Sequence, residues 1–367
     1  MTRPPIIEAI RAEARGHPDE IYRANLSYPD PAVTRNIFTL YDGNRWMEVG
    51  ERQPHPKMLF GEFWHEGELC ILFADTNTGK SVLAVQIAES IARSRKIDPF
   101  AAEAERQVVL YVDFELSGKQ FHLRYHGAGG SYAFSENFYR AQFNPENEMP
   151  GDAALYDQYL MAAITDRITQ LKATVLIVDN ITCMRNGTEN SRVALRLMKD
   201  LKQLKSTYGL SVLVLAHTPK RNPANPLTPD DLHGSKLLIN FADSAFALGK
   251  SAMQPGLTYL KQIKQRNTAE IFGAQNVCLG SIIKPANFVH FQFSGTGHEA
   301  DHLYRPPRLQ RQQLTQQIAA LSRQGYSQRR ISRQLRIPLS TVNRLMQDIN
   351  ILLGSAADGS EVEACLP

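Results

Sequence analysis

A run of small, polar and cationic residues at positions 74–81 has the composition of a phosphate-binding loop. The run reads Ala-Asp-Thr-Asn-Thr-Gly-Lys-Ser, follows the apolar stretch 69–73 and leads directly into a helical pattern. Successive N–H groups of such a loop, together with a helix N-terminus, form a cradle for anions. Gly79 lets the backbone approach phosphate, Lys80 supplies a charge to the β- and γ-phosphates, and Ser81 offers a hydroxyl to Mg²⁺. The pattern predicts a site for Mg²⁺ and ATP.

The loop differs from the usual pattern at one position, where Ala74 stands in place of the first glycine. An ordinary strand–turn–helix with a chance Gly-Lys-Ser is the alternative interpretation, and the correct flanking strand and helix argue against it. The residues expected to bind ATP are Ala74, Asp75, Thr76, Asn77, Thr78, Gly79, Lys80, Ser81 and Val82.

Acidic residues follow two further apolar stretches, where they would meet the loop. Asp179 ends the stretch 174–178, and its distance after the loop favours a Mg²⁺ ligand over a simple helix cap. The stretch 108–112 ends in Asp113-Phe-Glu115, which offers two carboxylates to orient an attacking water. We favour Glu115 as the general base, with Asp113 as its competitor and one of the two expected to be structural.

These residues need a scaffold that brings the ends of several strands together, and the sequence predicts one. Short apolar runs alternate with helical patterns, which is typical of a parallel α/β sheet covered by helices on both faces. The predicted strands lie at 69–73, 108–112, 174–178, 211–215, 245–248, 257–263, 276–283 and 287–293. The predicted helices between them lie at 80–95, 153–171 and 190–207.

Composition shifts divide the chain into five parts. Polar, proline-containing residues at the start indicate an arm with a short helix at about 6–15, and clustered Gly and Pro near position 300 indicate a linker. The expected parts are an arm over 1–56, an ATPase domain over 57–293, a linker over 294–309, a helical domain over 310–350 and a disordered acidic tail over 351–367.

The charge of the chain is segregated. There are 41 Lys and Arg residues against 37 Asp and Glu, a formal net charge of +4. Residues 303–347 contain nine Arg, no Lys and no acid, whereas residues 348–367 contain four acids and no base. The remaining 302 residues therefore carry a charge close to zero. One basic segment on a neutral body predicts a nucleic-acid-binding appendage.

The basic segment shows helical spacing in three pieces and resembles a helix-turn-helix of the resolvase or homeodomain-like type. Leu314, Ile318 and Leu321 share one face, Ser327 can cap a second helix, and Ser340 or Thr341 opens a third. In that fold the third helix enters the major groove. A helical protein-interaction domain is the alternative. The expected DNA contacts in this segment are Arg329, Arg330, Arg333, Ser340, Thr341, Asn343 and Arg344.

The ATP-site motifs together resemble the RecA-like ATPases, and most closely the DnaB-type hexameric helicases and the plasmid RepA-type helicases. The resemblance rests on the loop with its leading Ala74, on Phe114-Glu115-Leu-Ser and on Val-Asp179, and it covers about 57–293. It implies a RecA-like sheet. It also implies that the chain self-associates, either as a hexameric ring or as a filament. It also implies a γ-phosphate sensor at His217, for which a structural histidine at a strand end is the alternative.

Two later stretches match positions that contact DNA or a neighbouring subunit in that family. Lys220 and Arg221 lie in a proline-rich loop that would touch single-stranded DNA, as Lys236 would beyond it. A solvated surface loop is an equally good interpretation of these residues. Lys264 and Arg266 match a Lys-x-Arg that reaches the γ-phosphate of the neighbour, and a basic exposed strand end is the alternative.

The leading hypothesis is a DNA-dependent ATPase of the RepA/DnaB helicase type that acts in DNA replication or recombination. The region before position 56 and the basic extension both depart from chromosomal helicases, which favours a plasmid or mobile element. The main rival is a non-translocating ATP switch in a DNA-binding regulator or a recombination or transposition accessory protein. A signalling ATPase similar to the KaiC group is a third alternative.

The sequence also bears on location. Four separated cysteines in no metal-ligand spacing indicate reduced thiols, and there is no apolar run of the length of a membrane span. An apolar leader is not evident at the first residues either. A cytoplasmic protein is therefore expected.

Overall fold

The computed structural model describes residues 38–144, 153–181, 191–232, 236–305 and 308–347. The chain divides into two compact units, residues 1–55 and 56–367. The helix expected at 6–15 and the acidic tail expected at 351–367 lie outside the described residues.

The first unit contains a helix that the sequence analysis missed. Helix α4 (Gly43–Glu51) begins at Asp42, whose carboxylate accepts a hydrogen bond from the Arg45 N–H at 2.9 Å. An aspartate at this position satisfies one of the N–H groups left free by the first turn. The expectation of an irregular arm throughout 1–56 is therefore wrong for residues 43–51.

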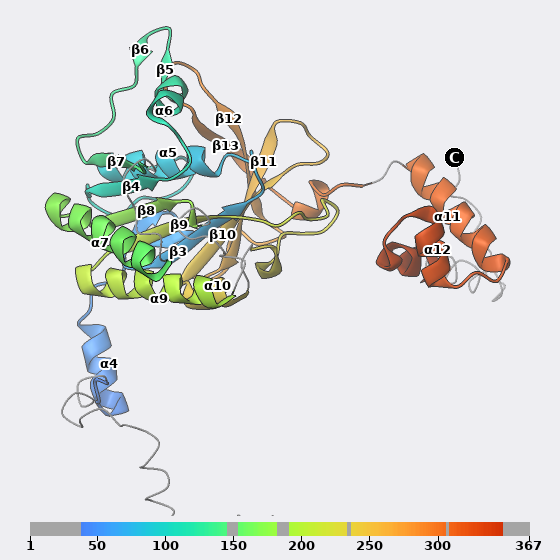
Figure 1. The fold of residues 1–367 in the computed structure, drawn as a ribbon, viewed down its shortest axis with the longest axis horizontal. Coiled ribbons are helices and arrows are strands. Elements are labelled where there is room, and N and C mark those ends of the chain that lie inside the picture. Colours follow the sequence, from blue (N-terminus) through green and yellow to red (C-terminus); the bar gives the residue numbers. More distant parts are fainter. Residues whose placement is uncertain (1–37, 145–152, 182–190, 233–235, 306–307, 348–367) are drawn as a thin grey trace, which may run out of the picture. The chain divides into compact units, whose positions relative to one another are not determined.

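Within the described residues, nine strands form the central sheet of the second unit, in the order β13-β12-β11-β10-β3-β9-β8-β4-β7 (Figure 1). The six strands from β10 to β7 are parallel. They are β3 (Leu69–Ala74), β4 (Val109–Asp113), β7 (Phe138–Gln142), β8 (Val175–Asp179), β9 (Ser211–His217) and β10 (Ser244–Lys250). The predicted α/β fold with a RecA-like parallel sheet is confirmed.

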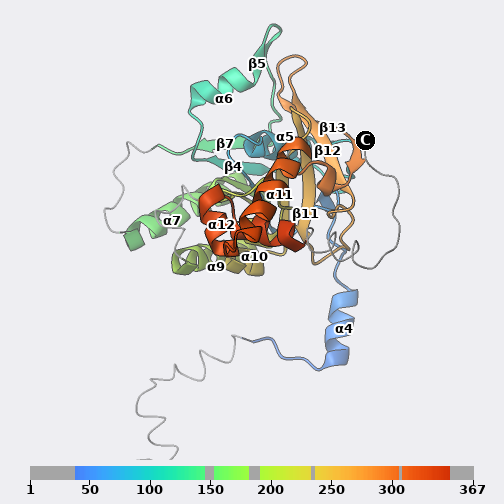
Figure 2. The same ribbon diagram turned by 90° about the vertical axis from the view of Figure 1, so that its right-hand side faces the viewer.

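Alternate residues of the central strands enter two separate cores, one on each face of the sheet. Ile71 of β3 packs in the core with the α7 and α9 side chains, whereas Leu72 packs in the core with α5. Helix α5 thus covers one face, and α7, α9 and α10 cover the other (Figures 1 and 2). These helices are α5 (Lys80–Arg93), α7 (Ala153–Leu171), α9 (Ser191–Tyr208) and α10 (Lys236–Phe241). In the described ranges, none is both long and apolar enough to cross a membrane.

The sheet is mixed, because three strands extend it in antiparallel fashion beyond β10. They are β11 (Leu257–Lys264), β12 (Val277–Ile283) and β13 (His290–Gly297). The connections between them are short, and no helix intervenes, which favours antiparallel pairing over a parallel crossover. The apolar runs of the sequence predict these three strands but not their direction.

Smaller elements decorate the sheet. Helix α6 begins at Ser117, which forms a reciprocal capping box with Gln120. The short elements are β1 (Met58–Phe60), β2 (Trp64–His65), α6 (Gly118–Arg124), β5 (His126–Gly127), β6 (Gly130–Ser131) and two single 3₁₀ turns, η1 (Pro229–Asp231) and η2 (Glu299–Asp301). None of these, nor β7, was predicted.

The predicted linker begins too early. Strand β13 continues to Gly297, and the Glu299 carboxylate then lies buried in the domain of the central sheet. It accepts hydrogen bonds from the Leu227 N–H and from Lys261 Nζ, both at 2.6 Å. A buried carboxylate paired with a lysine belongs to the domain that surrounds it. The start of the linker at 294 is therefore wrong, and the domain extends past residue 299.

Three helical segments follow: α11 (Arg308–Arg323), α12 (Gln328–Leu335) and residues 339–347. Ser327 caps α12, as predicted, through its bond from the Arg330 N–H. Arg336 adopts a left-handed conformation with φ +53°, which explains why glycine is common at such a turn. The segments share one small core built on Ile318, Ile331, Val342 and Leu345.

Candidate nucleotide site

The predicted site residues meet at the carboxyl edge of the parallel strands. Strands β3, β9, β8 and β4 are consecutive neighbours in the sheet. Ala74 pairs with His217 between β3 and β9, and Asp113 pairs with Asp179 between β4 and β8. In an open parallel sheet, ligands bind at this edge. The strand register thus brings four segments to one place, although Ala74 and His217 are 143 positions apart in the sequence.

The loop after β3 requires glycine at position 79. Gly79 has φ +101°, a conformation that side chains rarely adopt. A Cβ atom there would lie 2.6 Å from Ile282 Cδ1 and 2.8 Å from Phe291 Cζ. Lys80 then opens α5, so the free N–H groups of the first helical turn face the loop. This is the geometry of an anion cradle.

The Lys80 side chain lies inside the loop. Its Nζ donates to the carbonyls of Ala74 at 2.9 Å and Asp75 at 3.1 Å, and it lies 3.0 Å from His217 Nδ1. Burial lowers the pKa of Lys80 below its usual value, and the charge of Glu115 acts in the opposite direction. A phosphate in the cradle would compete with these three acceptors for the ammonium group.

Asp179 fits the role of a Mg²⁺ ligand. Its side chain is only 1% exposed, and Oδ2 accepts the Tyr111 hydroxyl at 2.6 Å. The other oxygen, Oδ1, is buried and has no hydrogen-bond partner among the described residues. Burial raises the pKa of Asp179 to about 6, while the Tyr111 and Ser81 hydroxyls act against the rise. An orphaned carboxylate oxygen beside Ser81 is what a bound cation would satisfy.

The described residues contain no group of three or more His, Cys, Asp or Glu side chains that could hold a metal ion. Mg²⁺ does not require such a group, because it keeps several waters and binds through one or two protein oxygens together with the phosphates of a nucleotide. Ser81 and Asp179 would hold it, and the cation would neutralise charge that develops on the phosphates.

The structure separates the roles of the two acids after β4. Asp113 is buried, and it accepts hydrogen bonds from the N–H groups of Glu115 and Leu116 and from Arg140 Nε at 2.8 Å. It therefore fixes the turn that carries Glu115. The Glu115 side chain is about one third exposed, and the hydrogen bond from His217 holds its pKa below the usual value. An ionised, accessible carboxylate can accept a proton from water, which favours Glu115 over Asp113.

Asn180 lies between Glu115 and His217, and its place in the site was not predicted from the sequence. The Asn180 Nδ2 donates to Glu115 Oε1 and lies 2.9 Å from His217 Nε2, which is 3.2 Å from the same Glu115 oxygen. A charged Lys80 can only donate, so His217 Nδ1 accepts from it and the ring proton lies on Nε2. That proton then points to Glu115 Oε1, and the Asn180 Nδ2, which can only donate, bonds the same Glu115 oxygen and not the ring nitrogen beside it. Only the position of Asn180, immediately after Asp179, could have singled it out in the sequence.

Lys250 is a second residue that the sequence analysis missed. It ends β10, and its Nζ lies 3.4 Å from the Thr76 carbonyl of the loop. A cavity of about 610 Å³ opens there, and the buried hydroxyls of Thr78 and Thr218, which line it, have no partner among the described residues. The residues lining this cavity include none of the carboxylates discussed above. The Lys250 ammonium and the hydroxyls of Thr78 and Thr218 could therefore bind polar groups of a nucleotide other than the phosphates in the loop.

Lys264 and Arg266 lie away from this cluster. Strand β11 is antiparallel to β10, with Lys264 opposite Ala245, at the end of the sheet remote from the loop. Lys264 Nζ donates to the carbonyls of Ile239 and Ala242, at 2.7 and 2.8 Å, near the end of α10. The Arg266 side chain is about half exposed. Neither can reach the loop of its own chain.

The loop residues predicted to bind DNA differ from each other. Lys220 is exposed. Arg221 is 14% exposed and donates to Asp231 at 3.3 Å and to the Asn225 carbonyl. Its guanidinium folds the 218–231 loop onto itself and has fewer free donors for DNA than an unpaired arginine would have, so the DNA contact of Arg221 stays a prediction. The side chain of Lys236 lies outside the described residues.

The candidate contacts of the C-terminal helices are accessible. Those found exposed are Arg329, Arg330, Arg333, Ser340, Asn343 and Arg344, and Thr341 is half-buried. The Arg330 guanidinium lies over the Tyr326 ring at 4.2 Å, which limits its motion. Exposed arginines surround the core of this segment, and no acidic residue occurs in 303–347 to neutralise them.

Comparison with known proteins agrees with the geometry. Residues 42–223 match the family model described as an AAA domain, a segment that includes the loop, Glu115, Asp179 and His217 but ends before Arg266. A comparison with curated proteins gives no match. The similarity of residues 42–223 to an AAA domain, together with the cluster at the end of the strands, supports a nucleotide-binding site of the P-loop ATPase class in this part of the chain.

Proposed function

We propose that the chain is a Mg-ATP-dependent, DNA-binding ATPase of the RepA/DnaB helicase type whose hydrolysis site is completed by a neighbouring subunit. Its role would lie in DNA replication or recombination, on a plasmid or mobile element. The observation that carries the proposal is the convergence of Lys80, Glu115, Asp179 and His217 from four neighbouring strands.

Each residue of the cluster has a distinct task in hydrolysis. Lys80 would leave its carbonyl partners to bind the β- and γ-phosphates, and the freed His217 would follow the state of the γ-phosphate. Glu115, oriented by Asn180, would accept the proton of the attacking water. Because Lys80 and Glu115 are both linked to His217, a change at the phosphate reaches the base through a single side chain.

Arg266 supports completion of the site in trans. Hydrolysis of a phosphoanhydride is strongly accelerated by a guanidinium that stabilises charge on the transferred group. None of the four converging residues is an arginine, and Arg221, which lines the cavity beside the loop, is bound to Asp231 and to the Asn225 carbonyl. Arg266, by contrast, is half exposed at the remote end of the sheet. An oligomer in which this end faces the loop of the next subunit would supply the missing charge. Such a ring or filament is expected to form with ATP.

DNA binding is assigned to the C-terminal helices, interpreted as a helix-turn-helix. Arg329, Arg330 and Arg333 would bind phosphates, and the helix over 339–347 would enter the major groove. Replacing these three arginines with alanine is expected to weaken binding to duplex DNA and to reduce the slope of log K against log salt by up to about 3. Fluorescence anisotropy at several salt concentrations measures both quantities.

The control for that prediction is the triple alanine variant of Arg95, Lys96 and Lys119, exposed cations of the ATPase domain. It should leave affinity and slope nearly unchanged. Equal losses in the two variants would show that the affinity comes from the whole surface, contrary to the assignment.

A second candidate function is an ATP switch that binds DNA without translocating along it. One observation favours it: Arg221 is held inside the 218–231 loop by Asp231, which leaves the loop with fewer cations for a single strand. Strand displacement on a forked duplex separates the candidates. Displacement that requires ATP supports the helicase, whereas DNA-stimulated hydrolysis without displacement supports the switch. Hydrolysis that ignores DNA would contradict both.

A further inference from the structure

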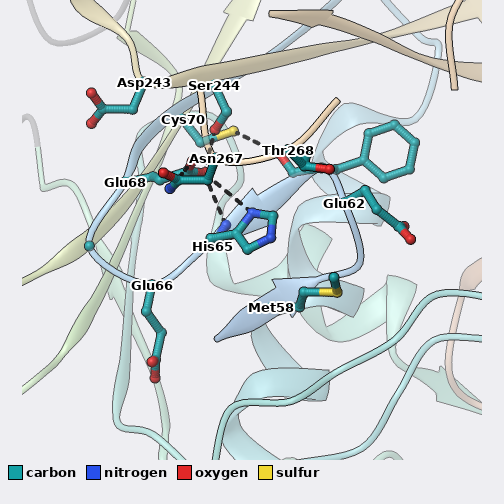
Figure 3. A network of polar contacts seen from close by, with 12 residues as sticks. Met58, Glu62, His65, Glu66, Glu68, Cys70, Asp243, Ser244, Asn267 and Thr268 are labelled. Atoms are coloured by element: carbon teal, nitrogen blue, oxygen red, sulfur yellow. Dashed lines mark hydrogen bonds and ion pairs between the residues drawn. The ribbon is translucent and has the colours of Figure 1, made fainter. Parts of the chain in front are cut away.

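Two carboxylates hold the segment that carries Arg266. Glu68 is buried and accepts hydrogen bonds from Asn267 Nδ2 at 2.8 Å and from the Ser244 hydroxyl at 2.7 Å (Figure 3). Asp243, beside it, accepts from Arg266 Nη1 at 3.0 Å. Adjacent residues of one segment are thus bound by two fixed acids, and the segment has little freedom to move.

The two acids are themselves fixed to the start of β3, the strand that leads to the phosphate-binding loop. Asp243 Oδ2 accepts from the Leu69 N–H and from Lys205 Nζ, both at 2.9 Å, and its own N–H donates to the Leu69 carbonyl at 2.8 Å. Glu68 is the residue immediately before β3 and also accepts from the His65 N–H at 3.0 Å. The Arg266 segment is therefore anchored to the centre of the sheet.

The contacts of Arg266 hold the guanidinium by one edge only. Nη1 bonds Asp243, and Nη2 lies 3.4 Å from the Asn240 carbonyl. A guanidinium has five N–H donors, so most remain available, and the side chain is 48% exposed. Lys264, by contrast, directs its ammonium to three carbonyls of the chain near the end of α10. Lys264 thus fixes the end of β11, and Arg266, two residues later, extends toward solvent.

We propose that Asp243 is a positioning residue for Arg266 in the reaction on the neighbouring subunit, with Glu68 holding the adjacent Asn267. The proposal rests on the proposed function, since it requires Arg266 to act in trans. A guanidinium fixed before the neighbour binds ATP needs no reorganisation when charge develops on the phosphate. Without Asp243 the long arginine side chain would sample many rotamers, of which few would reach the phosphate.

A merely structural role for Asp243 makes a different prediction. Through the Leu69 N–H, Asp243 also supports β3 and hence the loop of its own subunit. If that support were its main contribution, its loss would harm the subunit that binds ATP. If positioning is its role, its loss harms the subunit that supplies Arg266.

Mixed oligomers distinguish the two roles. The donor chain carries Lys80→Ala and keeps Arg266, while the acceptor chain carries Arg266→Ala and keeps a working loop. Their mixture should hydrolyse ATP although each chain alone does not. Asp243→Asn is then placed on either chain, because asparagine keeps an acceptor for the Leu69 N–H but removes the charge that holds Arg266.

On the donor chain, Asp243→Asn is expected to lower kcat of the mixture by about 10- to 100-fold with KM for ATP unchanged. On the acceptor chain, which has no Arg266, it should change kcat by less than about 2-fold, because there is no guanidinium to position. Asp301→Asn on the donor is the control, because it removes a carboxylate from an exposed pair with Arg305 and should have no effect.

Loss of turnover with the variant on the acceptor, or no loss on either chain, would overturn the role given to Asp243 while leaving trans completion intact. A parent mixture that stays inactive contradicts trans completion itself, and the positioning role with it. If Asp243→Asn melts at a lower temperature than the parent chain, Asn267→Ala on the donor replaces it. That change releases the segment from Glu68 without altering the contacts of β3, and it should give the same donor-specific loss.

Discussion

Replacing Arg266 with alanine is expected to lower kcat for ATP hydrolysis by about 10³-fold or more, the effect of removing an arginine that acts in trans on a phosphoryl group. Binding of ATP should persist, since Arg266 lies at the end of the sheet remote from the loop of its own chain. Steady-state phosphate release and equilibrium binding of a fluorescent ATP analogue measure the two quantities.

Lys264→Ala is the matched control for that prediction. The Lys264 ammonium donates to carbonyls near the end of α10, so its loss should lower the free energy of unfolding by about 1–3 kcal/mol. The two variants should therefore differ in what they lose: the Arg266 variant should lose turnover, and the Lys264 variant should lose stability. Near-normal kcat in the Arg266 variant would contradict the trans site.

Glu115→Gln is expected to lower kcat by about 10²- to 10⁴-fold, because glutamine cannot accept the proton of the attacking water. The amide oxygen can still accept the Asn180 hydrogen bond, so the shape of the site and the affinity for ATP should be retained. A variant that binds ATP without hydrolysing it is the expected product, and single-turnover kinetics with pre-bound ATP test this directly.

Asp113→Asn separates the two acids after β4. Asp113 holds the N–H groups of Glu115 and Leu116 and pairs with Arg140, so its replacement should lower the melting temperature more than the turnover of folded protein. The assignment would be reversed if folded Asp113→Asn were inactive while Glu115→Gln retained turnover.

The sequence predicted the centre of the sheet well for a physical reason. Strands β3, β4, β8 and β9 are buried on both faces, so they are largely continuous apolar runs, and the last three end in a polar residue. The phosphate-binding loop has a strict order of parts, which makes Gly79, Lys80 and Ser81 recognisable from the sequence. Because neighbouring parallel strands end at the same edge of the sheet, the side chains at their ends lie close together.

Other features depend on contacts that a sequence does not display. The sequence alone does not decide between Glu115 and Asp113 as the general base. The structure does, because the Asp113 carboxylate already accepts hydrogen bonds from two N–H groups of the turn. Arg221 was a candidate for DNA because of its charge, whereas Asp231, ten residues later, binds it. Asn180 has no catalytic signature of its own, and its role follows from two partners 65 and 37 residues away in sequence.

The edges of the domain were predicted least well. The segment 294–297 was interpreted as part of a linker because of its glycines, yet residues 295–297 pair with β12. Strand β7 and helices α4 and α6 are short or exposed, so burial leaves little periodicity in their sequences. Propensity without burial is a weak signal.

The central claim is that the cluster at the end of β3 hydrolyses Mg-ATP, and steady-state phosphate release by the full chain tests it most directly. The account predicts turnover that requires Mg²⁺ and falls at least about 100-fold in Lys80→Ala, because the alanine removes the charge that binds the transferred phosphate. Equal phosphate release by the wild-type and Lys80→Ala proteins, purified in the same way, would contradict it.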